Sequence, residues 1–334
     1  MVILLLSGLK RVREPVPLTH FDVFCIMGVT EVKNMDKITA KQCFMDYVKD
    51  YDSENPMIYH KILHTFRVAD LAERIAGSVA SDKDSTDFAW FLGLLHDIGR
   101  FEQVRQYGTF IDSQSVDHAQ FGADLLFKEG LIDRFPTDGL FEGWRDMAET
   151  AIRLHNQLLL PEDLAPQTLL FARILRDADK IDIFRVVMEI PFEERIGKSR
   201  GLLTDAPEAS PEVMACVTAH RCIPRGARRS ILDGMISHCC LAFELEFEES
   251  RRLAAEQGDL LRLIEVGRET AGRLWGERAV QQMDILRQEI EKAWKIPVKI
   301  GRSGDQEAAA EGRMMGGLTD AGENRKILRP GSCR

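Results

Sequence analysis

Helical periodicity is the feature of this 334-residue sequence that most restricts what it can fold into. From Ile38 onward, apolar residues recur at steps of three and four almost everywhere, and no strand-like alternation stands out before residue 200. Residues 228–295 continue as two long helical patterns that separate near Gly258. The sequence therefore predicts an all-α fold, built as a bundle of helices.

Turn-forming and apolar residues mark where the individual helices should lie. A first helix is expected to begin near Thr39. The others are expected over about residues 59–79, 86–98, 115–128, 144–159 and 167–188. Residues 88–95 carry no charge, so we expect the helix that contains them to be buried nearly all round. Gly99 is expected to end that helix, and a polar loop should follow it.

Charge and cysteine usage exclude several classes of protein. A formal net charge of −9 repels nucleic acids and anionic membranes on average, so neither a nucleic-acid polymer nor a membrane is an expected partner. No segment approaches the about 18 consecutive apolar residues of a membrane helix. The seven cysteines include no Cys-x-x-Cys pair, which favours reduced thiols and a cytoplasmic location.

Histidine and aspartate residues stand out as candidate metal ligands. Four histidines lie on four successive predicted helices, one aspartate follows the second of them, and another lies in an acidic cluster on the next long helix. The set is His64, His96, Asp97, His118, His155 and Asp179. Helices of a bundle can point such side chains inward, and imidazole with carboxylate suits Zn, Fe, Mn or Ni. The set is too large for one tetrahedral zinc ion but suits two divalent ions.

The setting of His96 and Asp97 strengthens this interpretation. The pair follows an apolar run from Phe91 to Leu95, where an unpaired carboxylate would be costly to bury. A bound cation would compensate that charge. The alternative that stays open is a helix end at the surface, with both side chains simply solvated.

Three segments together resemble the HD-domain metal-dependent phosphohydrolases. The segments His64-Thr65-Phe66-Arg67-Val68, Leu94-Leu95-His96-Asp97-Ile98-Gly99 and Ala178-Asp179-Lys180 stand in the order of that family's H…HD…D pattern. The resemblance covers about residues 58–190. His118 and His155 fall where binuclear members have two further histidines. The GYP signature of the cyclic-di-GMP branch is absent, and Arg100 stands where many members have lysine.

The resemblance implies an HD-like helical bundle that holds two metal ions. By this resemblance the first ion would be bound by His64, His96, Asp97 and Asp179. The second would be bound by Asp97, His118 and His155, so that Asp97 bridges the two. Family members join their metals through such a carboxylate and a water molecule.

Three cationic side chains near these ligands are candidate contacts to a phosphate. Arg67, Arg100 and Lys180 each lie three or fewer residues from a proposed ligand. Arginine suits a phosphate through its planar fork, and lysine through its point charge. For each of the three, the alternative is an ordinary salt bridge to a neighbouring carboxylate.

The implied function is metal-dependent hydrolysis of a phosphate ester in a small phosphorylated metabolite or nucleotide. A metal-activated water would attack phosphorus, while Asp97 holds the metals and Lys180, Arg67 or Arg100 stabilises the developing charge. No cofactor other than the metals is expected. Two alternatives stay open: a mixed-valence di-iron oxygenase with the same ligand order, and a non-catalytic nucleotide-sensing module.

The chain is expected to divide into four parts. Residues 1–35 read as a weakly structured leader, within which Met27 and Met35 are alternative starts. Residues 36–200 form the HD-type domain and residues 201–300 a helical C-terminal extension, whose long helices suit either homo-oligomer contacts or a helical cap. Residues 301–334 are small, polar and mixed in charge, so this tail is expected to be disordered.

Overall fold

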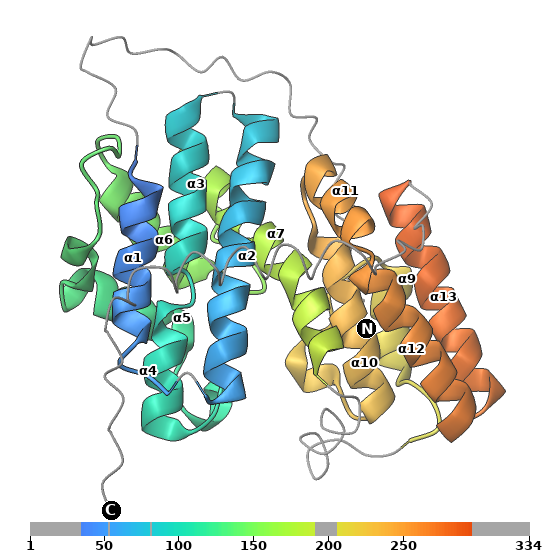
Figure 1. Ribbon diagram of the computed structural model, residues 1–334. Coiled ribbons are helices and arrows are strands. Elements are labelled where there is room, and N and C mark those ends of the chain that lie inside the picture. Colours follow the sequence, from blue (N-terminus) through green and yellow to red (C-terminus); the bar gives the residue numbers. More distant parts are fainter. Residues whose placement is uncertain (1–34, 53, 81, 191–205, 296–334) are drawn as a thin grey trace, which may run out of the picture. The chain divides into compact units, whose positions relative to one another are not determined.

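The computed structural model describes residues 35–52, 54–80, 82–190 and 206–295, and the regular elements within these ranges are all helical (Figure 1). The predicted all-α fold is therefore confirmed. The predicted tail and, apart from Met35, the predicted leader lie outside the described residues. No helix in the described ranges combines the length and apolar character that a membrane crossing needs.

The first group of helices runs from residue 37 to residue 189. Its members are α1 (Lys37–Val48), α2 (Pro56–Val79), α3 (Lys83–Leu95), α4 (Ile98–Tyr107), α5 (His118–Ala123), α6 (Trp144–Leu154) and α7 (Pro166–Glu189). Helix α3 packs against α2, α6 and α7, and its residues 87–95 are all buried, as the charge-free run predicts. Fully burying one large side chain such as Phe91 contributes about 1.5–3 kcal/mol to folding.

Helices α2 and α3 approach each other closely at Gly93. A Cβ atom at this position would lie 2.5 Å from the Cα of Ala69 and 2.7 Å from its backbone nitrogen. Both atoms belong to the backbone of α2, so neither can move away by a change of side-chain rotamer. The absence of a side chain at Gly93 therefore sets the distance between α2 and α3.

A glycine expected to end a helix instead lies inside one. The structure continues beyond Gly99 as α4, where the sequence predicts a polar loop. A Cβ at Gly99 would lie 2.6 Å from the carbonyl oxygen of His118 and from the nitrogen of Gly122. Gly99 is thus required because α4 and α5 approach closely there, and it does not end a helix as the sequence predicts. The helix ends at Gly108, which has a left-handed φ of 65°.

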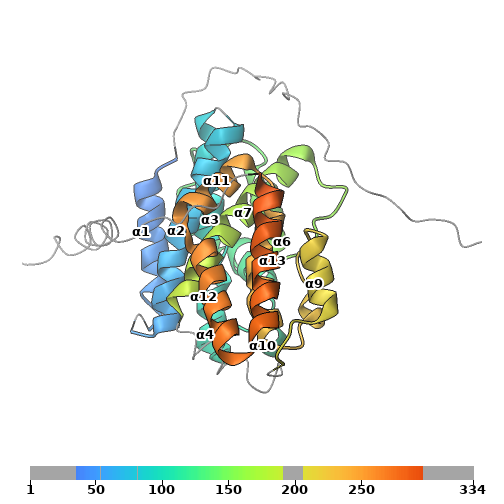
Figure 2. The same ribbon diagram turned by 90° about the vertical axis from the view of Figure 1, so that its right-hand side faces the viewer.

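The C-terminal helices are shorter than the sequence pattern indicates. They are α9 (Pro211–Thr218), α10 (Ile231–Cys239), α11 (Glu248–Gln257), α12 (Asp259–Leu274) and α13 (Glu277–Trp294). The break expected near Gly258 is confirmed, because this residue joins α11 to α12 with a φ of 77°. A second break occurs at Gly276, with a φ of 90°. Figure 2 shows α13 beside α12 and α9, which it contacts.

Helix α7 is shared by the two groups of helices. It packs against α2, α3 and α6 on one side and against α11 and α12 on the other. Lys180 on α7 forms an ion pair with Glu244 at 2.8 Å. Asp177 accepts backbone hydrogen bonds from Glu246 at 2.8 Å and Phe247 at 3.1 Å, and burial raises its pKa to about 6. Adjacent residues of α7 therefore face different parts of the protein.

Candidate metal centre

The candidate ligands come from elements that are far apart in the sequence. His64 lies on α2 and Asp179 on α7. His96 and Asp97 form the short junction between α3 and α4, so the apolar run of α3 carries them into the interior. As the residue before α4, Asp97 also lies at a helix N-terminus, where the helix dipole favours a carboxylate.

Helices α5 and α6 supply the remaining two histidines. His118 is the first residue of α5, which Asp117 caps by accepting hydrogen bonds from the backbone of Ala119 and Gln120. His155 directly follows the last residue of α6. All four histidines and Asp97 are less than 5% exposed, so the alternative of a solvated helix end does not describe His96 and Asp97.

A first group of ligand atoms surrounds one point between α2, α7 and the α3–α4 junction. His64 Nε2 lies 3.2 Å from His96 Nε2, and Asp97 Oδ2 lies 3.4 Å from both nitrogens. Asp179 Oδ1 lies 3.1 Å from His64 Nε2 and 3.7 Å from His96 Nε2. Around an ion with bonds of about 2.1 Å, neighbouring ligand atoms stand about 3.0 Å apart in an octahedron and about 3.4 Å apart in a tetrahedron. The observed separations fit either geometry.

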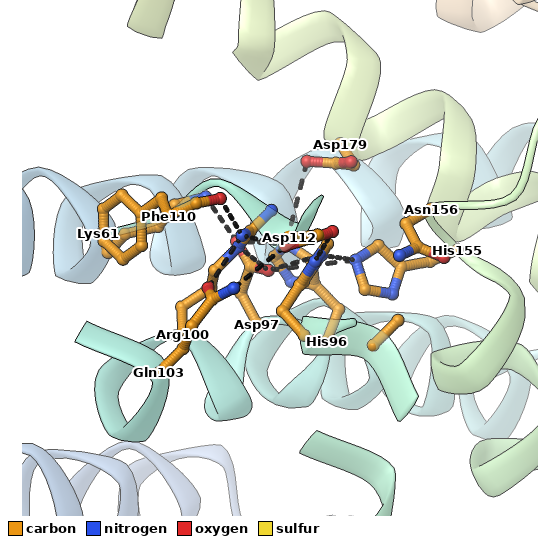
Figure 3. A network of polar contacts seen from close by, with 12 residues as sticks. Lys61, His96, Asp97, Arg100, Gln103, Phe110, Asp112, His155, Asn156 and Asp179 are labelled. Carbon is orange, nitrogen blue, oxygen red and sulfur yellow. Dashed lines mark hydrogen bonds and ion pairs between the residues drawn. The ribbon is translucent and has the colours of Figure 1, made fainter. Parts of the chain in front are cut away.

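A second group shares Asp97 with the first. The other carboxylate oxygen, Asp97 Oδ1, lies 3.4 Å from His118 Nε2 and 3.8 Å from His155 Nε2. The two histidine nitrogens are 3.1 Å apart. Asp97 thus offers one oxygen to each group, and Figure 3 shows Asp97 beside His96, with Asp179 on the neighbouring helix. Asp97 Oδ1 is buried and has no hydrogen-bond partner among the described residues.

All four histidines are oriented by a contact at their other ring nitrogen. His64 Nδ1 lies 2.7 Å from Asp182 Oδ2, and His118 Nδ1 lies 2.8 Å from Asp112 Oδ2. His96 and His155 face the carbonyl oxygens of Gly93 and Ile152, each at 2.7 Å. These oxygens can only accept, so each Nδ1 donates its hydrogen, and in the neutral form of each ring the lone pair of Nε2 points toward its partner. Facing lone pairs repel, and a cation between them removes the repulsion.

The charges at this centre follow from its burial and its contacts. Burial opposes ionisation of Asp97, but Lys61 and His96 hold the pKa of this carboxyl well below its usual range. Burial and Lys61 lower the pKa of His64, yet its hydrogen bonds to Asp179, Asp182 and Asp97 raise it to about 10. A proton on His64 therefore stands where a metal ion would displace it.

The histidines of the second group are held neutral. Burial, together with the nearby His118 and His96, lowers the pKa of His155 to about 3. Burial also lowers the pKa of His118, although its bond to Asp112 acts in the opposite direction. Neutral imidazole is the form that binds metal, so this pair is ready to act as ligands at neutral pH.

The outer carboxylates stay ionised. Burial raises the pKa of Asp179 and Asp182, but contacts with His64 outweigh it, so both lie below their usual range. Hydrogen bonding to His118 and the charge of Arg100 likewise lower the pKa of Asp112, against the effect of burial. The buried orphan oxygen of Asp97, the oriented histidines and the ionised carboxylates together fit divalent cations.

The three cationic candidates occupy different places. Arg67 donates to Asp182 at 2.6 Å and also pairs with Glu189 at 3.4 Å. Lys180 faces Glu244 in the C-terminal group. Arg100 has Nε 3.5 Å from Asp97 Oδ1, so among the three it is the one that contacts a proposed ligand. The roles of Arg67 and Lys180 as substrate contacts stay predictions.

Sequence reasoning missed two residues of the centre. Lys61 Nζ lies 2.5 Å from Asp97 Oδ2, and Asp112 orients His118. Lys61 precedes His64 by one helical turn on α2, so its spacing could have placed it on the same face. Asp112 lies in the loop between α4 and α5, where no periodic pattern indicates a direction.

Other polar residues near the centre make contacts outside the two ligand groups. His60 pairs with Glu189 at 3.4 Å and lies outside both ligand groups. Asn156 donates to the Asp117 side chain at 2.9 Å, which fixes the segment after His155 against the start of α5. Asp117 therefore positions the two histidines of the second group relative to each other.

A family model matches part of this chain. It is described as the HD domain, and the match covers residues 62–183. That range contains all the candidate ligands but not Lys61. Neither the curated proteins nor the solved structures contain a match.

Proposed function

We propose, from the match of residues 62–183 to the HD-domain family model, that the protein is a metal-dependent phosphohydrolase that acts on a small phosphate ester. The observation that carries the proposal is the pair of ligand groups that share Asp97. Such an arrangement suits two divalent ions about 3.5–4 Å apart, which can clamp the attacking and leaving oxygens of an in-line displacement. When bound, the ions would supply an activated water and stabilise charge on the phosphoryl oxygens.

The charge of the centre favours an anionic substrate. Four carboxylates lie among the ligands or against the histidines: Asp97, Asp112, Asp179 and Asp182. Three cations pair with them: Lys61, Arg67 and Arg100. With neutral histidines, two divalent ions would convert a single net negative charge into three positive ones. A doubly charged phosphate would be drawn to such a centre.

Residues of the chain would share the remaining tasks. Asp97 would hold the two ligand groups together, because its two oxygens face different histidines. Asp182 and Asp112 would keep His64 and His118 in the correct tautomer. Arg100 Nε is buried without a hydrogen-bond partner among the described residues and is available to a phosphoryl oxygen at the second group.

The direct test is metal analysis combined with phosphate release. We expect protein purified without added metal and then loaded with Mn, Fe, Ni or Zn to bind two ions per chain and to release phosphate from part of a phosphoester panel. The assay is run with and without oxygen. Consistent binding of one ion or none after loading, or turnover that requires oxygen and consumes no ester, would refute the proposal. The second outcome would favour the di-iron oxygenase, for which the same ligands would suffice.

Removing a histidine of the second group should separate the two ions. We expect His118→Ala and His155→Ala to fold and keep the first ion, because His64, His96 and Asp179 remain. Activity should fall by about 100-fold or more, since one ion can no longer stabilise the transition state. Metal content and phosphate release measure both effects.

A control histidine lies close by on α2. His60 contacts Glu189 and neither ligand group, so His60→Ala should keep two ions and wild-type activity. Loss of both ions in His118→Ala would indicate one cooperative site, and full activity in both second-group variants would leave these histidines a structural role only.

A further inference from the structure

Lys61 makes fewer polar contacts than the other cationic side chains around the centre, Arg67 and Arg100. Its ammonium contacts one carboxylate, Asp97, and lies 5.8 Å from the centre of the Phe110 ring. Arg67, by contrast, binds both oxygens of Asp182, at 2.6 and 3.1 Å. Arg100 donates through one nitrogen to three acceptors, which include the carbonyl oxygen of Phe110 and Asp112.

The atom that Lys61 contacts belongs to the first ligand group. Asp97 Oδ2 lies 3.4 Å from both His64 Nε2 and His96 Nε2, and the Lys61 ammonium lies 2.5 Å from this oxygen. An ion bound to the same oxygen would stand beside a like charge at a distance where repulsion in a buried site is strong. Lys61 and a metal ion therefore compete for Asp97.

The side chain of Lys61 can leave without unfolding anything. It is 17% exposed, whereas Asp97 is 2% exposed, so the lysine reaches the centre from its solvent-facing edge. Four flexible methylene groups let an ammonium move by several ångströms, and within the described ranges no second carboxylate pairs with it. Phe110 lies under both Lys61 and Arg100, whose guanidinium carbon is 5.6 Å from the ring centre. Figure 3 shows these three residues together beside Asp97.

We propose that Lys61 is the cation that neutralises Asp97 while the centre lacks metal, and that it turns to the phosphate of the substrate once a metal ion has replaced it. The inference rests on the proposed function for the identity of the anion. Metal would then bind before phosphate. The same lysine would weaken metal binding and strengthen phosphate binding.

Titration of metal and of inorganic phosphate tests the two effects separately. In metal-stripped protein, we expect Lys61→Met to bind Mn²⁺ about tenfold more tightly than wild type, because the competing charge is gone. In Mn²⁺-loaded protein, the same variant should bind inorganic phosphate about tenfold more weakly, the loss expected for one charge-assisted hydrogen bond. Calorimetric titration measures both without any turnover. Lys61→Arg should keep the phosphate affinity within a few-fold of wild type.

A matched control removes the same charge elsewhere. Lys83 pairs with Asp87 at 2.6 Å on α3, away from the ligand groups, so Lys83→Met should change neither affinity. Unchanged or weaker Mn²⁺ binding in Lys61→Met would overturn the inference, because a merely structural role cannot strengthen metal binding. Unchanged phosphate binding, or no phosphate binding by the Mn²⁺-loaded wild type, would overturn it as well. If both affinities shift as expected but no ester is hydrolysed, the proposed function fails and the role of Lys61 stands.

Discussion

Asp97→Ala is expected to cost the protein both metal ions and to lower phosphate release by at least about a thousand-fold, more than any other single ligand change. The reason is that Asp97 alone among the candidate ligands faces both groups of histidines. Every other ligand belongs to one group, so its loss leaves the second group complete. Metal content and phosphate release, measured on the same preparations, give the result.

Asp179→Ala is the matched comparison, because Asp179 faces the first group of histidines. It should lose the first ion and keep the second. The bridging role of Asp97 is wrong if Asp97→Ala keeps two ions and most of its activity while Asp179→Ala does not.

The melting temperature of Asp97→Ala relative to wild type should depend on whether metal is present. Without metal, wild type must bury an ionised carboxylate whose main support is Lys61, so the alanine variant should melt at a similar or higher temperature. With added metal, wild type should gain stability by mass action and the variant should not. Thermal melts with chelator and with metal show whether the two curves cross over in this way.

Gly93→Ala is expected to destabilise the protein by about 3 kcal/mol or more. The added Cβ would lie 2.5 Å from the Cα of Ala69, a distance that real Cβ atoms do not show, and α2 and α3 would have to separate. His64 lies on α2 and His96 directly follows α3, so metal affinity should fall together with stability. Urea unfolding followed by circular dichroism gives the first effect and metal titration the second.

Gly77→Ala is the control within α2. Its Cβ would meet only Thr86 Cγ2, at an ordinary 3.8 Å, and alanine in a helix is favoured over glycine by about 0.5–1 kcal/mol. This variant should be as stable as wild type or slightly more stable. Equal urea midpoints for Gly93→Ala and Gly77→Ala would show that the close approach at Gly93 does not limit the packing.

The identity of the helices was more accessible to sequence reasoning than their ends. Apolar spacing and the charge-free run before His96 predict α2, α3 and α7 correctly, because each buries a wide apolar face. Helix α4 was missed because a glycine near its start looks like a stop signal. Only the packing of the helices shows that a side chain at Gly99 would collide with the backbone of α5.

The candidate ligands were accessible because their chemistry is unusual for a buried place. A histidine followed by an aspartate after an apolar helix has few explanations, and the structure brings these two together with His64, His118 and His155. The partners of charged side chains could not be predicted in the same way. A long side chain reaches in many directions, so sequence spacing could not tell that Lys180 would meet Glu244.

The sharing of α7 between two groups of helices limits how the protein can be shortened. Asp179 faces the metal centre, while its neighbour Lys180 and the nearby Asp177 are satisfied by residues 244–247 of the C-terminal half. A fragment ending after α7 would lack the Glu244 carboxylate that pairs with Lys180 and the backbone amides that Asp177 binds, within two residues of a ligand. Residues 244–247 therefore cover the part of α7 that lies next to a candidate ligand. Protease cleavage or truncation before residues 244–247 should therefore disturb the position of Asp179 at the candidate metal centre.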